Sequence, residues 1–270
     1  MNEGEWLAEA AYKNWVSVFT LFKEFTFKEK GVIAGKFPHI PLIFVNNVFQ
    51  TDLTNQEVDQ TIELIISKYR EEKIDFSWSI TPFTNPNNFD LYLKKYGFIE
   101  VGEVPHMALL HSNIDKNQFD KELHEADLKI RKIDINNLDL YMNPFTLGFG
   151  LSENIQLVNG FNKFLLDFLR LTANDIHSGL FLGYVDDKPV STALGIIAND
   201  VMGIYNIATI PEYRKRGYGR LMTTDLIIRG INAKVRGSIL QSSEMGKGVY
   251  EKLGFVTKYY QKQFKLEEKL

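Results

Sequence analysis

The sequence predicts an α+β fold, in which amphipathic helices pack on a sheet of largely antiparallel strands. Residues 5–27 place apolar side chains at steps of three and four, which is the spacing of one wide helical face. Three strand-like runs then follow one another at 179–185, 190–197 and 202–209. Asp-Asp and Asn-Asp turns separate these runs, and because such turns join neighbouring antiparallel strands, we expect a meander here.

The other elements are predicted from the same periodicities and from turn and cap signals. Thr54-Asn55-Gln56-Glu57 has the pattern of a capping box that opens a helix. Helices are expected at 54–73, 89–96, 135–149 and 157–172, from residue 217, and at 245–253. Strands are expected at 40–49, 76–81, 98–101, 107–110, 128–131 and 238–241, and two more strands close the chain.

The domain organisation is predicted from one polar stretch and one internal echo. Residues 113–127 are rich in charge and read as a linker between a domain at 1–112 and a domain at 128–270. The run at 92–98, Tyr-Leu-Lys-Lys-Tyr-Gly-Phe, resembles Tyr-Glu-Lys-Leu-Gly-Phe at 250–255. The echo favours two related halves in tandem, although Gly-Phe after a helix is also an ordinary cap followed by a core aromatic.

Composition limits the classes of partner. The 270 residues carry a net charge of -3 with no long block of one sign, which argues against a nucleic-acid partner. The absence of Cys excludes disulfides, thiolate zinc sites and a Cys nucleophile. The five His show no metal-binding spacing, so we expect no metal. An acidic start and the lack of a 20-residue apolar run lead us to expect a soluble, cytoplasmic protein with no signal peptide and no membrane partner.

The most informative stretch is 204–220, where a strand runs into a basic turn and two glycines then open a helix. The first N–H groups of a helix have no partner within it, and the helix dipole adds positive charge there. Gly217 and Gly219 carry no side chain that would keep a phosphate from the backbone, and the turn brings four cationic side chains: Arg214, Lys215, Arg216 and Arg220. This arrangement is typical of a pyrophosphate cradle, although a solvated basic turn has the same pattern.

Two other phosphate-binding motifs fit poorly. A Walker loop needs Gly-x-x-x-x-Gly-Lys-Ser/Thr, which the sequence around Gly246-Lys247-Gly248 lacks. A dinucleotide fingerprint needs a third glycine near position 222, which is Met222.

A second block lies one helix and one strand further on. It reads Gln-Ser-Ser-Glu-Met-Gly-Lys-Gly-Val-Tyr-Glu-Lys-Leu-Gly-Phe over 241–255. The Arg-x-x-Gly-x-Gly turn after Ala-Thr-Ile-Pro resembles the acetyl-CoA loop of GNAT acyltransferases, and Ser-x-x-Gly before Tyr-Glu-Lys-Leu-Gly-Phe resembles their second signature. The resemblance covers about 128–266. It implies α/β/α layers around a mixed, mostly antiparallel twisted sheet, with acetyl-CoA as co-substrate and no metal.

The resemblance also implies roles for particular residues. Backbone groups of Ile207 and Thr209 would pair with the pantetheine arm, and amides from Lys215 to Arg220 would hold the pyrophosphate. Ser243 stands where the family often has a cofactor-contacting Asn, which leaves that contact open. The cofactor-binding residues expected in this way are Ile207, Ala208, Thr209, Arg214, Lys215, Arg216, Gly217, Tyr218, Gly219, Arg220, Ser243 and Gly246.

Tyr250 stands where many family members place the acid that protonates the departing thiolate, so it is the expected catalytic residue. The alternative for Tyr250 is a packed aromatic. A backbone N–H where the strand bulges near Ala208 would stabilise the oxyanion. No general base is identified, and the candidates Glu244 and Glu153 are equally well explained as surface carboxylates.

The expected activity is transfer of acetyl to an amine of a small molecule or amino acid by direct attack, by a chain that is either monomeric or a homodimer. The first half lacks the glycine pair and arginine after its strand and carries Asp52 and Thr54 there. We therefore expect that it binds no CoA and walls the acceptor pocket. Two alternatives keep the fold: an aminoacyl-tRNA-dependent transferase, and a non-catalytic acyl-CoA sensor.

Overall fold

Two compact units make up the computed structural model, which describes residues 2–267. Unit 1 comprises the residues up to Trp15 together with His106–Lys258, and unit 2 comprises Val16–Pro105 and the residues from Tyr259 on. This division follows spatial contacts and does not coincide with breaks at 112 and 128. Residue 1 and residues 268–270, at the ends of the predicted domains 1–112 and 128–270, lie outside the described residues.

Unit 1 contains the meander that the sequence predicts. Strands β7, β8 and β9 pair antiparallel in succession, and β10 runs parallel to β9 after the helix α7. The strand order is β5-β10-β9-β8-β7-β6. The elements are α1 (Glu3–Thr20, in part), β5 (Phe98–Leu110, in part), α4 (Lys116–Glu125), β6 (Lys129–Lys132), α5 (Leu138–Phe149), α6 (Ile155–Leu171), β7 (Gly179–Val185), β8 (Lys188–Ala198), β9 (Val201–Thr209), α7 (Tyr218–Asn232), β10 (Gly237–Gln241), α8 (Glu244–Lys252) and the start of β11 (Val256–Leu266).

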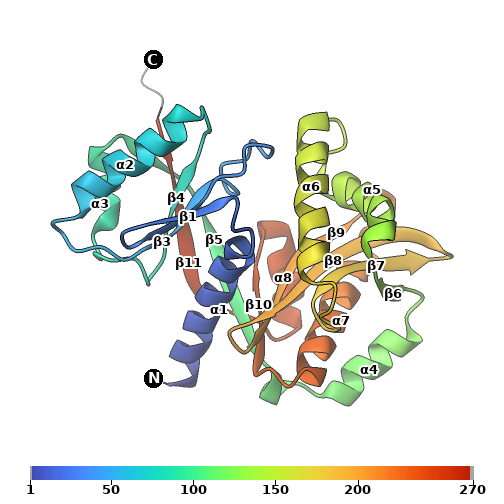
Figure 1. Ribbon diagram of the computed structural model, residues 1–270. Coiled ribbons are helices and arrows are strands. Elements are labelled where there is room, and N and C mark those ends of the chain that lie inside the picture. The colour runs from blue at the N-terminus through green and yellow to red at the C-terminus, as the bar shows by residue number, and fades with distance from the viewer. Residues whose placement is uncertain (1, 268–270) are drawn as a thin grey trace. The chain divides into compact units, whose positions relative to one another are not determined.

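Helices cover both faces of the unit 1 sheet (Figure 1). Ala193 of β8 belongs to the core under α7, whereas its neighbour Thr192 lies beside Tyr141 of α5. Adjacent residues of a strand point to opposite faces, so α5 and α7 lie on opposite sides of β8 and β9. The predicted fold class, a mixed and mostly antiparallel sheet flanked by helices, is confirmed.

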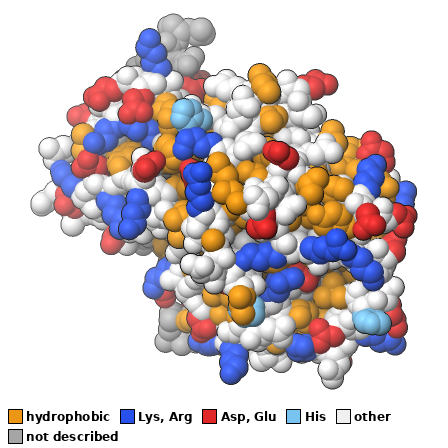
Figure 2. All heavy atoms as spheres, turned by 45° about the vertical axis from the view of Figure 1, so that its right-hand side comes forward, with side chains coloured by type: hydrophobic (Ala, Val, Ile, Leu, Met, Phe, Trp, Pro, Cys, Tyr) orange, Lys and Arg blue, Asp and Glu red, His pale blue; other side chains and the backbone are white. Residues whose placement is uncertain are grey.

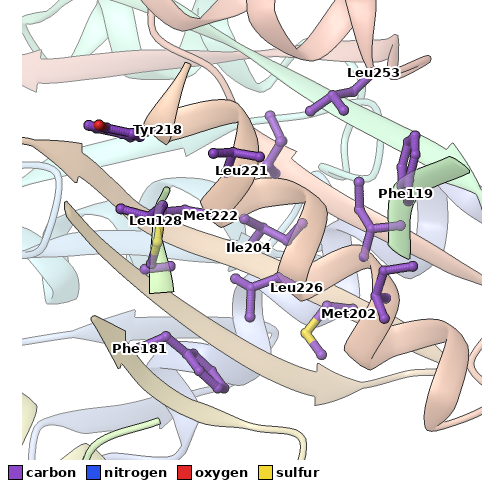
Figure 3. Close-up of a cluster of buried hydrophobic side chains, with 14 of the residues drawn as sticks. Phe119, Leu128, Phe181, Met202, Ile204, Tyr218, Leu221, Met222, Leu226 and Leu253 are labelled. Atoms are coloured by element: carbon purple, nitrogen blue, oxygen red, sulfur yellow. The ribbon is translucent and has the colours of Figure 1, made fainter. Parts of the chain in front are cut away.

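The main core of unit 1 lies between α7 and the sheet (Figure 3). Leu221, Met222 and Leu226 of α7 pack against Met202 and Ile204 of β9. Each of these side chains is almost fully removed from water, and burial of one such side chain contributes about 1.5–3 kcal/mol. This packing holds α7 against β9, and the turn at 210–217 joins the end of the strand to the start of the helix.

Unit 2 repeats the same succession of elements on a smaller scale. Its strands β1, β2 and β3 are antiparallel neighbours, α2 follows, and β4 runs parallel to β3. The strand order is β1-β2-β3-β4-β11. The elements are β1 (Thr26–Glu29), β2 (Val32–Gly35), β3 (Asn47–Thr51), α2 (Val58–Glu71), β4 (Ser77–Ile80), α3 (Phe89–Lys95) and the remaining parts of α1, β5 and β11.

The closing strand of each unit comes from the end of the other unit's series of elements. Residues 106–110 of β5 pair antiparallel with β10 in unit 1, whereas residues 262–265 of β11 pair antiparallel with β4 in unit 2. The repeat of meander, helix, parallel strand, helix and closing strand agrees with the echo seen in the sequence. The tandem relationship of the halves stays a prediction.

Several predicted elements differ from the structure. The expected linker contains α4, whose N-terminus is capped by Asp115 accepting from the N–H groups of Asn117 and Gln118. The first helix ends at Thr20 rather than near residue 27, because Thr26–Glu29 pairs with β2. The two strand segments predicted at 98–101 and 107–110 form one strand, and the chain closes with one long strand rather than two.

Two further predicted boundaries differ from the structure. The strand expected at 40–49 begins only at Asn47, because the buried Asn46 side chain bonds to the backbone of Phe37 and Ile40 and holds a turn. Helix α2 begins at Val58, not at Thr54.

Candidate functional site

The distal part of β9 carries a bulge and an edge without a strand partner. The β8 register shifts by one residue between Thr192, which faces Ala208, and Leu194, which faces Tyr205. Asn206 lies in this bulge with a left-handed φ of 52°. Within the described residues, the parallel ladder to β10 ends at Ile204, so the edge of β9 beyond that residue is open to an added chain.

The turn after β9 presents main-chain N–H groups at the start of α7. Gly217 is the N-cap with φ 85°, a conformation that favours glycine, and no side chain caps the helix. Lys215 is also left-handed, with φ 62°. Over the part of the chain that the structure describes, no hydrogen bond is found for the backbone N–H groups of 215–220. Successive free amides at a helix N-terminus form a concave site for an anion.

The cations of this turn have different partners. The Arg214 side chain donates to the carbonyls of Thr209 (3.1 Å) and Gly148 (2.8 Å), so it ties the turn to the end of β9 and to α5. The Arg216 guanidinium lies 4.8 Å from the centroid of the Tyr213 ring. Lys215 is exposed, and no partner for its side chain is found within residues 2–267.

Two more of the predicted cofactor residues face elements of the expected linker. Arg220 forms a two-point ion pair with Glu122 of α4, at 2.6 and 2.9 Å. The Tyr218 hydroxyl donates to Asp127 at 2.8 Å, and burial followed by this carboxylate raises the pKa of Tyr218. The side chains of Arg220 and Tyr218 therefore anchor the start of α7, and their backbone amides remain available.

Helix α8 brings Ser243, Gly246 and Tyr250 together. The Ser243 hydroxyl is the N-cap of α8 and accepts from the Gly246 N–H at 3.2 Å. A Cβ on Gly246 would lie 2.8 Å from the Tyr250 ring, so the glycine makes room for that ring. Tyr250 also packs edge-on against Phe255, with centroids 6.1 Å apart.

Tyr250 combines a packed ring with a shifted acidity. Its ring contacts the main core of unit 1, as the packed-aromatic alternative requires. Burial raises the pKa of Tyr250 to about 12, so the hydroxyl stays protonated at neutral pH. The structure thus supports both properties at once: a fixed ring and a proton-bearing hydroxyl.

Three groups that shape this region carry no recognisable signal in the sequence. Gly148 of α5 lies so close to β9 that a Cβ there would meet the Ala208 Cβ at 2.7 Å. Tyr141 of α5 is fully buried beside the bulge. Glu122 orients Arg220 from a segment expected to be a linker. Only their three-dimensional neighbours distinguish these residues from ordinary helix residues.

The predicted base candidates are both on the surface. Glu244 is the first residue of α8, and Glu153 lies in the turn between α5 and α6.

On the face shown in Figure 2, basic, acidic and apolar side chains are interspersed. Among residues 2–267 there is no group of three or more His, Asp or Glu placed to hold a metal, and none of the helices has the length and apolar content needed to cross a bilayer.

Comparisons with known proteins agree with this fold. Residues 177–257 match the profile of the acetyltransferase (GNAT) domain. A GCN5-related N-acetyltransferase from Kribbella flavida has a TM-score of 0.65 at 16% identity, over 96% of each chain. A conserved protein of unknown function from Staphylococcus epidermidis has a TM-score of 0.61 at 17% identity, over 89% of this chain and 92% of that one. No curated protein matches the sequence.

The matched segment contains β7 to α8, and so includes the meander, the turn before α7 and Tyr250. Residues 177–257 therefore match the GNAT acetyltransferase domain in sequence, and the fold of the chain is similar to that of a solved GCN5-related N-acetyltransferase.

Proposed function

We propose that this protein is an acyl-CoA-dependent N-acyltransferase that transfers acetyl from acetyl-CoA to an amine of a small molecule or amino acid by direct attack. The observation that carries this proposal is the row of free amides from Lys215 to Arg220 at the uncapped start of α7, next to the open edge of β9. A nucleotide thioester offers a pyrophosphate for the amides and an amide-bearing arm for the edge.

The geometry of the turn and of the strand edge supports particular contacts to the acyl donor, acetyl-CoA. The pyrophosphate would bind the amides of Lys215–Arg220, and Gly217 and Gly219 would admit it to the backbone. The pantetheine arm would pair with the main chain of Ile207 and Thr209 beyond the end of the β10 ladder. Lys215 would add a mobile positive charge, whereas Arg214 supports the turn from behind.

The reaction needs one proton donor and one charge-stabilising group from this chain. The amine nitrogen attacks the thioester carbon, the C–S bond breaks, and the proton on the Tyr250 hydroxyl passes to the departing sulfur. The proton that the amine nitrogen loses passes to water, from which the Tyr250 hydroxyl is reprotonated. A backbone N–H at the β9 bulge, close to Ala208, would bind the carbonyl oxygen as it gains negative charge. A Tyr of pKa about 12 is a weak acid in water, but the same burial also disfavours the thiolate, so the transfer remains feasible.

The proposal is tested first by binding and then by turnover. Acetyl-CoA should raise the melting temperature in a concentration-dependent way, and about 2.7 kcal/mol of stabilisation is expected at 100 times the dissociation constant. Thiol release in a screen of primary amines should then find an acceptor. Binding without turnover would favour the sensor, and no binding would favour the aminoacyl-tRNA route.

A further inference from the structure

One buried hydroxyl beside the β9 bulge has no role in the folded chain itself. Tyr141 of α5 is 0% exposed, and its ring stacks on Phe145 with centroids 5.9 Å apart. Within residues 2–267, the Tyr141 hydroxyl belongs to three buried side-chain oxygens without a hydrogen-bond partner, together with those of Thr61 and Thr224. A buried hydroxyl without a partner lowers the stability of the fold, so its presence needs a reason.

The surroundings of Tyr141 separate it from the two threonines. All three residues lie in helices, Thr61 in α2, Thr224 in α7 and Tyr141 in α5, so the difference is in what faces the hydroxyl. Thr192 of β8 and Asn206 of β9 face the Tyr141 hydroxyl closely enough to lower its pKa by hydrogen bonding, although no hydrogen bond of regular geometry joins either of them to it. The hydroxyl therefore lies at the one place where β9 departs from regular pairing.

The two neighbours are already held in place. The Thr192 hydroxyl donates to the Asn206 carbonyl at 2.8 Å, which fixes the backbone of the bulge. Asn206 is left-handed, a costly conformation for a residue with a side chain, and the pairing of β9 with β8 shifts by one residue around it. The bulge thus brings backbone N–H groups and a spare phenolic O–H to the same spot.

We propose that the Tyr141 hydroxyl donates a hydrogen bond to the carbonyl oxygen of the bound thioester, alongside the N–H groups of the β9 bulge. This inference rests on the proposed function and adds a second oxyanion donor to it. The tyrosine keeps its proton throughout: it binds the oxygen more strongly as charge develops there, and no bond to Tyr141 forms or breaks.

The electrostatics of the position suit such a donor. Burial raises the pKa of Tyr141, an effect that its neighbours Thr192 and Asn206 only partly oppose. The phenol is therefore neutral over the working range of pH, and a neutral donor in a dry site stabilises a growing negative charge without reorganisation.

The decisive experiment compares two unreactive CoA thioethers by calorimetry with the full chain. S-(2-oxopropyl)-CoA carries a ketone where the thioester has its carbonyl, and S-propyl-CoA lacks that oxygen. Wild type should bind the ketone more tightly than S-propyl-CoA, because both the bulge N–H groups and Tyr141 donate to its oxygen. Tyr141→Phe should bind S-propyl-CoA like wild type and bind the ketone about 3- to 10-fold less tightly than wild type does, which is the effect of one lost hydrogen bond.

A matched control and a stability measurement exclude a purely structural role. Tyr69 in unit 2 is equally buried, but its hydroxyl donates to the Gly35 carbonyl at 2.6 Å. Tyr69→Phe should lower the melting temperature and leave the ketone preference intact. Tyr141→Phe should melt at or above the wild-type temperature, because it removes a hydroxyl that has no partner, and its kcat should fall at least about 10-fold with an unchanged KM for the amine.

The outcomes are distinguishable. If wild type binds neither analogue, the proposed function fails and the role of Tyr141 fails with it. If wild type binds both analogues equally, or Tyr141→Phe keeps the full ketone preference, only the role of Tyr141 is rejected. A raised KM with unchanged kcat in Tyr141→Phe would also reject it, because that result assigns the hydroxyl to acceptor binding.

Discussion

The two strand-to-helix turns of this chain, β9 to α7 in unit 1 and β3 to α2 in unit 2, occupy equivalent places in the repeated succession and have opposite chemistry. In unit 1 the helix starts at a left-handed glycine with no side-chain cap. In unit 2 the Glu57 side chain, just before the helix, accepts from the N–H and the hydroxyl of Thr54. The Thr54 hydrogen bonds lower the pKa of Glu57, so a carboxylate stands where an anion would have to bind.

The edges of β3 and β9 beyond their parallel partners also differ, since the edge of β3 is occupied and that of β9 is open. Both β3 and β9 have a one-residue register shift against the preceding strand. In unit 2 the edge beyond the parallel ladder is filled, because the Asn85 N–H donates to the Thr51 carbonyl (3.0 Å) and the Leu53 N–H donates to the Asn85 carbonyl (3.2 Å). The Trp78 indole also donates to the Thr51 hydroxyl. In unit 1 the corresponding edge of β9 has no such loop within the described residues.

In the proposed function, a CoA site needs a free strand edge next to an uncapped helix start, and only unit 1 combines the two among the described residues. On this basis we propose that unit 2 binds no CoA. Its part in acceptor choice stays a prediction, and deleting residues 1–112 is a poor test of it, because residues 106–110 pair with β10 inside unit 1. Point substitutions at matched positions test the comparison better.

The largest effect is expected from placing a carboxylate in the unit 1 turn. Gly219→Glu should raise the Kd of acetyl-CoA by at least about 100-fold, because like charges opposed at a contact cost several kcal/mol. The variant should fold normally, since a Cβ at Gly219 would meet Ile207 only at an ordinary 3.7 Å and an acidic first turn favours a helix. Asn55→Glu at the exposed turn of unit 2 is the control, and equal losses in both variants would contradict the comparison.

The echoed tyrosines provide the second test. Tyr250→Phe should lower kcat by about 10- to 1000-fold with little change in acetyl-CoA affinity, because only proton donation to sulfur is lost. Tyr92→Phe, at the tyrosine that opens the echoed run in unit 2, should leave kcat unchanged. Steady-state thiol release measures both, and full activity in Tyr250→Phe would remove this residue from the mechanism.

The pH profile sharpens the assignment of Tyr250. A tyrosine can donate its proton only below its pKa, so its contribution to kcat disappears as the pH rises through that value. Burial raises the pKa of Tyr250 to about 12. The ratio of wild-type to Tyr250→Phe kcat should therefore stay constant from pH 7 to about pH 10.5. For a tyrosine with the ordinary pKa of about 10, more than half of the hydroxyl's contribution to kcat would be lost at about pH 10.5. Such a decline would contradict the buried environment.

The smallest effect is expected at the exposed cation of the turn. Lys215→Ala should weaken acetyl-CoA binding about 3- to 5-fold at low salt, and less at higher ionic strength, because exposed charges are screened. Lys73, which is likewise exposed and left-handed but lies in unit 2, is the matched control. Binding that is insensitive to salt in both variants would show that the amides alone hold the anion.

The sequence by itself determined the meander, the order of strand, basic turn and glycine-opened helix, and the placing of Tyr250 one helix later. These features are local, since they depend on period-two and helical spacing and on glycine conformation, which neighbouring residues encode. It also indicated the repeat, through the echo at 92–98 and 250–255.

Only the tertiary structure decided which groups of the turn are free. Arg214 and Arg220 look alike in sequence, yet partners 66 and 98 residues away engage both of them and leave Lys215 exposed. The exchange of β5 and β11, the filled edge of β3 and the spare hydroxyl of Tyr141 arise from pairings between distant segments. Such contacts depend on packing in three dimensions, which no local pattern of residues specifies.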